Sequence, residues 1–337
     1  MVTLGFVGYG YWGPNVLRNF YQNPRAKILK AYDSDATNAG RLQEHYPTMA
    51  VSATLDDIMD DPAIEAVGIA TPAFTHYTLA RRALEANKHV FVEKPIALDV
   101  KEAEQLIKLA DERGRVLMVG HVYKYNVAVQ KVKELIDRGD LGTIQYARSN
   151  RTSLGPRIRT DVNVVWDYAI HDIYLAMYLF GGKPLHVRAW GKSCLRENIE
   201  DVVMIELGFA NGVRVWVHCS WYEPVKARDI TIVGSRQMLI YDEVPPEEKI
   251  IIYRRGFEPI EGTDRRGNVG LALFDEGFLA PHLDWQEPLR VECNHFLMCI
   301  LEGKTPLSDG IDGKQTLEVI YAVNESLRRN GEEISLA

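Results

Sequence analysis

A carboxylate and an amine stand side by side at one point of the chain, in the tripeptide Glu93-Lys94-Pro95. The apolar run at residues 89–92 comes directly before them and predicts a buried strand. Proline cannot continue that strand, so both charged groups are expected at its carboxyl end. Ligands of open α/β sheets bind outside the carboxyl ends of the strands, and Glu93 and Lys94 are therefore candidate ligand-binding residues.

A second pair, Asp167 and His171, lies within a helix predicted over residues 165–180. Residues four apart share a helix face, so the carboxylate can orient the imidazole and raise its basicity. A catalytic base requires such tuning. Taken alone, however, this spacing favours a structural or solvated contact over catalysis.

A glycine-rich run follows a strand predicted at residues 2–7 and precedes a helix opened by Pro14. The run reads Gly8-Tyr9-Gly10-Tyr11-Trp12-Gly13. In this pattern the first glycine makes a tight turn, the second lets the backbone approach a pyrophosphate, and the third packs the helix closely. The helix N-terminus then faces the phosphates. The run therefore predicts a dinucleotide site to which all six residues contribute.

An acidic residue, Asp33, follows the next predicted strand, at residues 26–32. A carboxylate at this place accepts hydrogen bonds from the adenosine ribose and repels a 2′-phosphate. The sequence therefore predicts NAD as the cofactor, with Asp33 and Ser34 beside the ribose. Because Ser34 and Arg41 are also suited to a phosphate, NADP is the alternative.

Short apolar runs alternate with helical patterns up to residue 121, which predicts a doubly wound parallel sheet. Further strands are expected at residues 64–70 and 115–119, and helices at residues 75–86, 99–112 and 126–138. Thr71-Pro72 ends one of these strands and is expected to pack on the cofactor. A plain strand-stopping turn is the alternative interpretation of that dipeptide.

The chain changes texture after residue 142 and becomes rich in alternating strands with hairpin turns. This pattern predicts a mostly antiparallel sheet with one face covered, whose other face is suited to an oligomer interface. The strands are expected at residues 144–148, 186–190, 202–207, 213–218, 230–233 and 249–253. A surface loop is expected at residues 254–270, with a substrate lid as the alternative, and two closing helices at 288–302 and 311–329.

The predicted fold class is α/β, with an N-terminal Rossmann domain over residues 1–121. Residues 122–337 are expected to form a C-terminal α/β domain with a large open sheet, for substrate binding and oligomerisation. The two closing helices, at 288–302 and 311–329, are assigned to this second domain, and the alternative is that they pack against the first domain.

Composition bounds the class of protein. Of 337 residues, 46% are hydrophobic and 25% charged, as in ordinary globular proteins. The net charge of −7 and the lack of a large basic tract argue against a nucleic-acid partner. No apolar run is long enough for a membrane span, and the first residues lack signal-peptide features, so a cytoplasmic protein is expected. The four cysteines show no CxxC spacing, and neither a metal site nor a disulfide is expected.

Taken together, the motifs of this chain resemble those of the Gfo/Idh/MocA oxidoreductases from end to end. The matching motifs are Gly8-x-Gly10-x-x-Gly13, Thr71-Pro72 with His76, Glu93-Lys94-Pro95, Asp167-x-x-x-His171 and Ser308-Asp309-Gly310-x-x-Gly313. The resemblance implies a Rossmann domain, a C-terminal domain with an open sheet, and a homodimer or homotetramer assembled through that sheet. It also implies NAD(P)-dependent oxidation or reduction of a sugar, inositol or nucleotide-sugar carbon.

The resemblance also assigns roles to residues. Lys94 matches the lysine that hydrogen-bonds the reacting oxygen, and Glu93 matches a residue near the nicotinamide ribose. His171 matches the proton-transferring histidine, with Asp167 as its acidic companion, and Thr71, Pro72 and His76 fall in the cofactor site. Neutral His171 then acts as the base while Lys94 stabilises the developing alkoxide.

Residues 150–167 resemble a branch found beside nucleotide-sugar biosynthesis, which includes UDP-sugar 3-dehydrogenases. Arg157 and Arg159 are suited to pairing with a diphosphate, with surface or interdomain charge as the alternative. Further candidates for contacts with sugar hydroxyls are Tyr123, Tyr125 and Asn163. The leading hypothesis is a nucleotide-sugar oxidoreductase. The alternatives are a dehydrogenase of a free sugar, polyol or inositol, and an NAD(P)-binding regulator without turnover.

Overall fold

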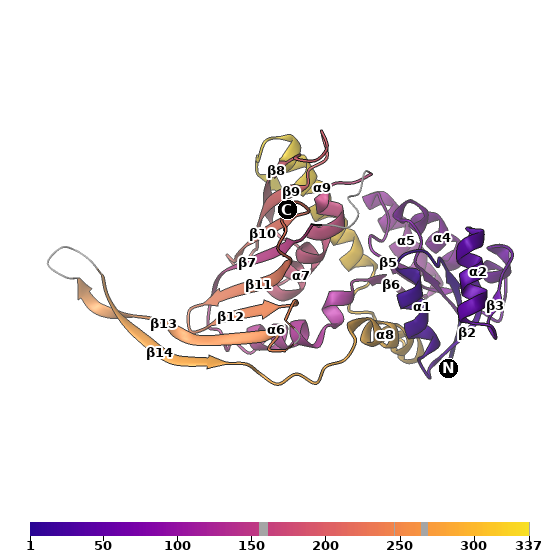
Figure 1. Ribbon diagram of the computed structural model, residues 1–337, viewed down its shortest axis with the longest axis horizontal. Coiled ribbons are helices and arrows are strands. Elements are labelled where there is room, and N and C mark those ends of the chain that lie inside the picture. The colour runs from indigo at the N-terminus through magenta and orange to yellow at the C-terminus, as the bar shows by residue number, and fades with distance from the viewer. Residues whose placement is uncertain (155–160, 246, 264–268, 337) are drawn as a thin grey trace. The chain divides into compact units, whose positions relative to one another are not determined.

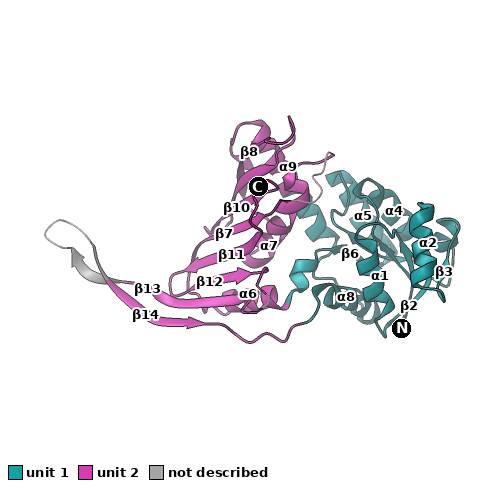
Figure 2. Ribbon diagram, in the orientation of Figure 1, with its two compact units in different colours: residues 1–126, 286–318 teal, residues 127–285, 319–337 magenta. Residues whose placement is uncertain are grey.

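The computed structural model describes residues 1–154, 161–245, 247–263 and 269–336. The chain forms two units, which Figure 2 shows in different colours. Unit 1 comprises Met1–Asn126 and Gln286–Glu318, and unit 2 comprises Val127–Trp285 and Val319–Ala337. The substrate-binding and oligomerisation roles assigned to residues 122–337 stay predictions.

Unit 1 is built on a six-stranded parallel sheet in the order β3-β2-β1-β4-β5-β6. The strands are β1 (Val2–Val7), β2 (Ala26–Tyr32), β3 (Ala50–Val51), β4 (Ala66–Ile69), β5 (His89–Glu93) and β6 (Leu117–Gly120). This is the strand order of dinucleotide-binding folds. Because the order reverses between β1 and β4, the carboxyl ends of these two strands flank the place where such folds bind ligands.

Helices cover both faces of this sheet (Figure 1). Right-handed crossovers place α1 and α2 on one face and α4 and α5 on the other. The helices of unit 1 are α1 (Gly13–Tyr21), α2 (Ala36–His45), α3 (Asp56–Met59), η1 (Ala73–Thr75), α4 (His76–Glu85), α5 (Val100–Arg113), η2 (Val122–Tyr125) and α8 (Pro288–Glu302).

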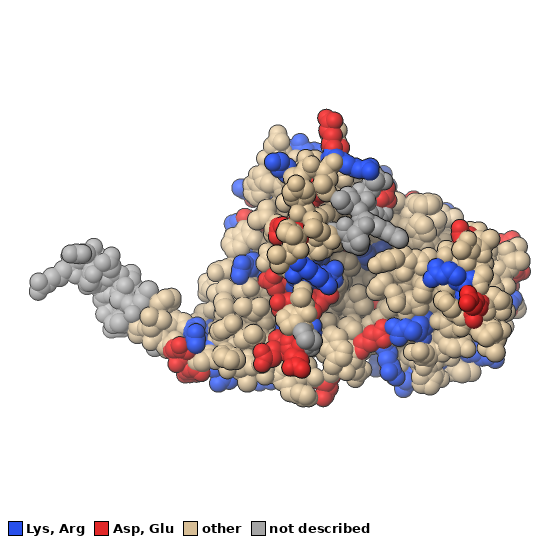
Figure 3. Space-filling view, viewed as in Figure 1, with Lys and Arg blue, Asp and Glu red and all other residues tan. Residues whose placement is uncertain are grey.

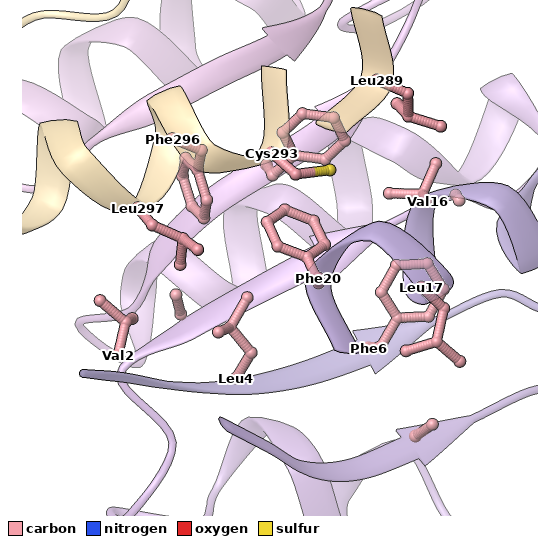
Figure 4. Packing of buried hydrophobic residues seen from close by; sticks show 14 of the residues in the cluster. Val2, Leu4, Phe6, Val16, Leu17, Phe20, Leu289, Cys293, Phe296 and Leu297 are labelled. Carbon is pink, nitrogen blue, oxygen red and sulfur yellow. The ribbon is translucent and has the colours of Figure 1, made fainter. Parts of the chain in front are cut away.

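Helix α8 completes the core of unit 1 although it comes near the end of the chain. Its Phe296 lies against Phe20 of α1 and Phe91 of β5, with ring centroids 6.0 and 5.8 Å away and edge-to-face geometry. Figure 4 shows the same helix placing Leu289, Cys293, Phe296 and Leu297 over Val2, Leu4 and Phe20. The cluster of buried apolar side chains therefore joins the N-terminal part of the chain to residues 289–297.

Unit 2 is built on a nine-stranded sheet in the order β14-β13-β12-β11-β7-β10-β9-β8-β15. Its pairs are antiparallel except for β7 with β10. The strands are β7 (Ile144–Thr152), β8 (His186–Lys192), β9 (Val202–Gly208), β10 (Arg214–Ser220), β11 (Ala227–Gly234), β12 (Met238–Asp242), β13 (Ile250–Thr263), β14 (Val269–Leu279) and β15 (Ile334–Ser335).

The helices of unit 2 cover one face of this sheet (Figure 1). They are α6 (Val127–Asp137), the π-helical segment η3 (Val165–Ala169) and α7 (Ile170–Phe180). Helix α9 (Gly310–Arg328) begins in unit 1 and ends in unit 2. Along β10 the residues alternate between exposed and buried, so the uncovered face carries every second side chain. The predicted fold class is thus confirmed.

The surface loop expected at residues 254–270 was wrong. The structure instead has β13 and β14, paired from Ile252 with Leu279 to Thr263 with Val269. The described side chains of this ribbon are mostly exposed, including Phe257 and Leu273, so no buried face imposes the alternation that marks a strand in a sequence.

Within the described residues, no helix combines the length and apolar character that crossing a bilayer requires. On the face that Figure 3 presents, Lys and Arg are interspersed with Asp and Glu rather than gathered into a field of one sign.

Candidate active site

The glycine loop joins β1 to α1 at the carboxyl end of the parallel sheet. Gly8 has φ of 101°, and a Cβ there would meet the Ala70 carbonyl oxygen at 2.5 Å. A Cβ on Gly13 would lie 2.1 Å from the carbonyl oxygen of Gly8. The predicted tight turn and close helix packing are therefore confirmed. A Cβ on Gly10 would have no protein atom within 4 Å, which keeps the space that a pyrophosphate needs to approach the backbone.

The three aromatic side chains of the loop have different surroundings. Tyr9 is 1% exposed and its hydroxyl lies 2.8 Å from Nδ1 of His45, so its side chain belongs to the core. Tyr11 is 86% exposed. Trp12 donates its indole N–H to Oε1 of Glu93 at 2.8 Å. Trp12 therefore connects the glycine loop to the tripeptide at the end of β5.

Asp33 follows β2 and is anchored by backbone donors. Its Oδ2 accepts a hydrogen bond from the N–H of Tyr9 at 2.5 Å, and its Oδ1 accepts one from the N–H of Asp35 at 2.8 Å. Each carboxylate oxygen has two acceptor sites, so both retain capacity for ribose hydroxyls. Ser34, next to it, is exposed. The side chain of Asp33 is thus fixed against the glycine loop.

His76 connects the loops that follow β4 and β5. Its Nε2 lies 2.9 Å from the Thr71 carbonyl oxygen and its Nδ1 lies 2.7 Å from that of Pro95. The side chain is 1% exposed, and burial lowers its pKa. His76 therefore lies behind the two loops and holds them together. Thr71 and Pro72 form the surface of the first loop, where the Thr71 hydroxyl lies 2.6 Å from that of Thr75.

Glu93 ends β5 with its side chain turned into the protein. Besides the Trp12 indole, its carboxylate accepts a hydrogen bond from the N–H of Lys94 at 3.3 Å. Burial raises the pKa of Glu93 to about 7, although the Lys94 charge and the Trp12 indole act in the opposite direction. Gly120 of β6 leaves room for this side chain, because a Cβ there would come within 2.9 Å of the carboxyl carbon.

A second buried carboxyl lies near Glu93 and was missed from the sequence. Glu292 of α8 is 0% exposed, and neither of its oxygens has a hydrogen-bond partner among the described residues. Burial and then the nearby Glu93 raise its pKa well above the usual value, because a buried charge without a partner is costly. Its spacing from Leu289 and Phe296, which places all three on the buried face of α8, is the signal that could have revealed it.

Lys94 follows β5 and is half-buried, and the peptide bond to Pro95 is cis. Its positive charge reaches His76 and His121 and contributes to the lowered pKa of each, after burial. Unit 1 therefore brings the glycine loop, Asp33, Thr71, Glu93 and Lys94 to the carboxyl end of one sheet.

In unit 2, Asp167 and His171 lie on successive turns of η3 and α7. Asp167 Oδ2 accepts the indole N–H of Trp221 at 3.1 Å, and Nδ1 of His171 lies 3.1 Å from the Tyr174 hydroxyl. The predicted helix therefore exists, with a π-helical first turn, a feature frequent at functional sites. Orientation of His171 by Asp167 stays a prediction.

Asp172, the neighbour of His171, is a further residue that the sequence did not reveal. It is 2% exposed and accepts hydrogen bonds from Nε of Arg151 at 2.6 Å and from the Ser149 hydroxyl. Both partners come from β7, so this buried ion pair fastens α7 to the sheet. It thereby fixes the helix that carries His171.

The remaining candidates occupy different places. The side-chain amide of Asn163 donates hydrogen bonds to Oε2 of Glu200 and to Oδ1 of Asn324, each at 2.8 Å. Tyr123 of η2 is half-buried, whereas Tyr125 is 1% exposed and its hydroxyl lies 2.9 Å from that of Ser308. Tyr125 is thus a core residue in unit 1. Arg157 and Arg159 lie outside the described residues.

A family model for oxidoreductases with an NAD-binding Rossmann fold matches residues 2–121, and one for the Gfo/Idh/MocA C-terminal domain matches residues 129–240. The chain belongs to the Gfo/Idh/MocA oxidoreductases. As a member of this family it is an NAD(P)-dependent oxidoreductase of the sugar and inositol type, and its first domain binds NAD.

Two named relatives span this Gfo/Idh/MocA chain almost completely. The UDP-N-acetylglucosamine 3-dehydrogenase of Acidithiobacillus ferrooxidans is 27% identical, with coverage of 96% of this chain and 98% of that one. Its solved structure matches with a TM-score of 0.81 at 25% identity, over 97% and 98% of the two chains. The NAD(+)-dependent scyllo-inositol 2-dehydrogenase of Bacillus subtilis is also 27% identical, over 100% and 95%.

The geometry of unit 1 fits the cofactor of this oxidoreductase family. The positive-φ turn at Gly8 and the open space at Gly10 leave room for a pyrophosphate beside the loop, and α1 begins directly after it. Asp33 stands at the carboxyl end of the neighbouring strand, where the ribose of a dinucleotide is held.

Proposed function

We propose that the protein oxidises or reduces a carbinol carbon of a nucleotide sugar, with Lys94 at the reacting oxygen. The observation that carries the proposal is the meeting of the glycine loop, Asp33 and Lys94 at the carboxyl end of one parallel sheet. The UDP-sugar relative, which matches nearly end to end, supports a nucleotide sugar as the substrate class.

In this proposal each residue has a distinct task. Bound NAD supplies hydride transfer at the nicotinamide. Lys94 donates a hydrogen bond to the substrate oxygen and stabilises the negative charge that develops there. His171 accepts the hydroxyl proton during oxidation and returns it during reduction, and Asp167 orients its ring.

The cofactor-side residues have supporting tasks in the same proposal. The Gly8–Gly13 loop cradles the pyrophosphate, Asp33 and Ser34 hold the adenosine ribose, and Thr71 and Pro72 pack on the cofactor. Glu93 is fixed between Trp12 and Lys94, which suits it to the nicotinamide ribose. His76 contributes indirectly, since it fastens the loops after β4 and β5.

A dehydrogenase of inositol or another free polyol is the second candidate. The scyllo-inositol relative is as similar in identity as the UDP-sugar relative and covers as much of the chain. The two candidates differ in one chemical requirement, because only a nucleotide sugar brings a diphosphate that basic side chains must hold.

A turnover assay separates these candidates. NAD and NADP are each offered with UDP-sugars, dTDP-sugars, free sugars and inositols, and formation of NADH or NADPH is followed by absorbance. We expect NAD with a UDP-sugar to give the highest kcat/KM. Turnover of inositols alone would establish the second candidate, and tight NAD binding without any turnover would contradict both.

Lys94→Ala tests the proposed role of the amine. We expect kcat to fall by about a hundredfold or more, because the charge that stabilises the alkoxide is lost. The matched control is Lys101→Ala, which removes an exposed lysine of α5 and should leave kcat unchanged. A near-normal rate for Lys94→Ala would refute the proposed mechanism.

A further inference from the structure

Three ionisable side chains meet at the carboxyl end of β6, and we call them the His121 cluster: His121, Lys124 and Asp312. Oδ2 of Asp312 lies 2.6 Å from Nδ1 of His121, and its Oδ1 accepts a hydrogen bond from Nζ of Lys124 at 2.5 Å. His121 and Lys124 are 1% and 3% exposed. The two contacts join η2 and the residue before it to the first turn of α9, almost two hundred positions away along the chain.

The cluster lies beside Lys94. Strands β5 and β6 are neighbours, and Glu93 pairs with Gly120 in their register. Lys94 and His121 are the next residues on the two strands, so both leave the sheet at the same edge. The charge of Lys94 accordingly contributes to the lowered pKa of His121.

The start of α9 is held rigidly against β6. The N–H of Val119 donates to the Ser308 carbonyl at 2.8 Å, and the Ser308 hydroxyl donates to the Val119 carbonyl at 2.7 Å. Asp309 caps the helix by accepting the N–H of Asp312 at 2.9 Å. Asp312 therefore has a fixed place in the first helical turn, where the helix dipole favours a carboxylate.

The charges of the cluster are balanced. Burial alone would raise the pKa of Asp312, but His121 and Lys124 outweigh it and hold that pKa below its usual value, so Asp312 is ionised. Burial lowers the pKa of His121 and keeps the imidazole neutral. Among the described residues, the ionisable groups that act on His121 are Asp312 of α9, Lys124 of η2 and Lys94. The cluster therefore carries one negative and one positive charge. On the β5 side of Lys94, the carboxyl group of Glu93 is a further ionisable group, and it is present in every variant below.

We propose that Asp312 and Lys124, with His121 between them and Lys94, set the electrostatic potential at the Lys94 amine and thereby the pH range of turnover. They are positioning residues that act through Lys94, and the link to turnover rests on the proposed function. A carboxylate favours the protonated amine, whereas a second ammonium opposes it. A nearby unit charge shifts the pKa of a partly buried amine by roughly one to two units.

Two single variants change this charge balance in opposite directions, and the double variant restores it. Asp312→Asn removes the negative charge and should lower the pKa of Lys94 by about one unit. Lys124→Met removes the positive charge and should raise that pKa by a similar amount. Asp312→Asn combined with Lys124→Met restores the charge sum and should return the pKa to the wild-type value. His121 stays neutral throughout the alkaline range in which lysines titrate.

The pKa of Lys94 can be measured without any substrate. The full-length protein is labelled in trace amounts with acetic anhydride between about pH 7 and 11, and acetylation of Lys94 is quantified by mass spectrometry. Lys101, exposed on α5, is the internal standard and should be acetylated to the same extent in all variants. Circular dichroism reports whether each variant is folded.

Opposite shifts in the two single variants, cancelled in the double variant, would establish the inference. Unchanged labelling of Lys94, or shifts of the same sign in folded variants, would overturn it. Asp312→Asn leaves Lys124 buried without its counter-ion and is the variant at risk of not folding. In that case Lys124→Met decides alone: a raised Lys94 pKa supports the inference, and an unchanged Lys94 pKa overturns it.

Kinetics then distinguish this inference from the proposed function. If Lys94 acts at the reacting oxygen, the alkaline limb of kcat/KM should follow the measured shifts in each variant. If the Lys94 pKa shifts but the pH profile of kcat/KM does not, Lys94 does not take part in the proton-linked step. The electrostatic inference would still hold. If wild type turns over substrate but neither the Lys94 pKa nor the alkaline limb of kcat/KM shifts in the variants, the inference is refuted and the proposed function is not.

Discussion

Glu93 lies in surroundings that oppose its ionisation. Burial opposes the charged form of this carboxyl group and outweighs the hydrogen bonds that it accepts from the Trp12 indole and the N–H of Lys94. Burial raises its pKa to about 7, against an ordinary value of 4.5. Glu93 therefore changes charge near neutral pH, at the point where the glycine loop meets Lys94.

This raised pKa predicts how stability depends on pH. The unfolded chain loses the Glu93 proton near pH 4.5, whereas the folded protein keeps it up to about pH 7. The stabilisation from this group is thus complete at low pH and is lost as pH rises through that window. Between about pH 5 and 8, wild type should lose up to about 3 kcal/mol of unfolding free energy relative to Glu93→Gln.

Urea unfolding across this pH range measures the difference for the protein without ligands. Glu44→Gln, which changes an exposed carboxylate on α2, is the control and should follow wild type. If the unfolding free energies of wild type and Glu93→Gln change in parallel with pH, the folded and unfolded states bind the Glu93 proton equally, contrary to the expectation.

At the same scale, the sequence located single residues better than it located their partners. Glu93 and Lys94 were predicted at a strand end because apolar runs and proline are local signals. The contact of His121 with Asp312 joins residues 191 positions apart, and the proximity of Glu93 to Glu292 also depends on the closed fold. No local pattern encodes such pairs, so the buried charges around Lys94 became visible only in the structure.

The glycine loop is the element that decides whether unit 1 accepts a dinucleotide, and its glycines do different things. Gly13→Ala would force a Cβ to within 2.1 Å of the Gly8 carbonyl, whereas Gly10→Ala meets no protein atom within 4 Å. We expect Gly13→Ala to lose roughly 2–4 kcal/mol of stability through displacement of α1. Gly10→Ala should keep wild-type stability and weaken NAD binding by at least about tenfold, since its methyl group fills the pyrophosphate space.

Urea unfolding and NAD titration by calorimetry, applied to both variants, test this division of roles. Gly40→Ala in α2 is the control, because a Cβ there also meets no atom within 4 Å and lies away from the loop. Undiminished NAD affinity in Gly10→Ala would contradict the placement of the pyrophosphate.

Elements with one buried face were predictable from the sequence, and elements without one were not. Strand β10 alternates between exposed and buried residues and was expected at nearly its observed bounds. In the ribbon of β13 and β14, Phe257 and Leu273 lie opposite each other and both are exposed, and residues 254–270 were taken for a loop. Periodicity records burial, so a strand exposed on both faces leaves no periodic signal.

At the scale of the whole molecule, the uncovered face of the nine-stranded sheet exposes large apolar side chains. Trp190 pairs with Met204 across β8 and β9, and the Tyr146 ring lies 5.7 Å from that of Trp216. These four side chains are between 39% and 50% exposed. A hollow on this face is lined by Trp190, Met204 and Trp216. Contiguous exposed apolar surface of this kind marks protein interfaces.

We propose that a second copy of the chain covers this face, as the family resemblance implies. Met204→Lys combined with Trp216→Lys places two charges at the centre of the patch, where desolvation makes them most costly. Sedimentation equilibrium should find an oligomer for wild type and a dissociation constant raised at least about a hundredfold for the double variant. Leu301→Lys, an equally exposed apolar position on α8, is the control and should assemble like wild type. A monomeric wild type, or a double variant that assembles like wild type, would contradict the proposal that a second copy covers this face.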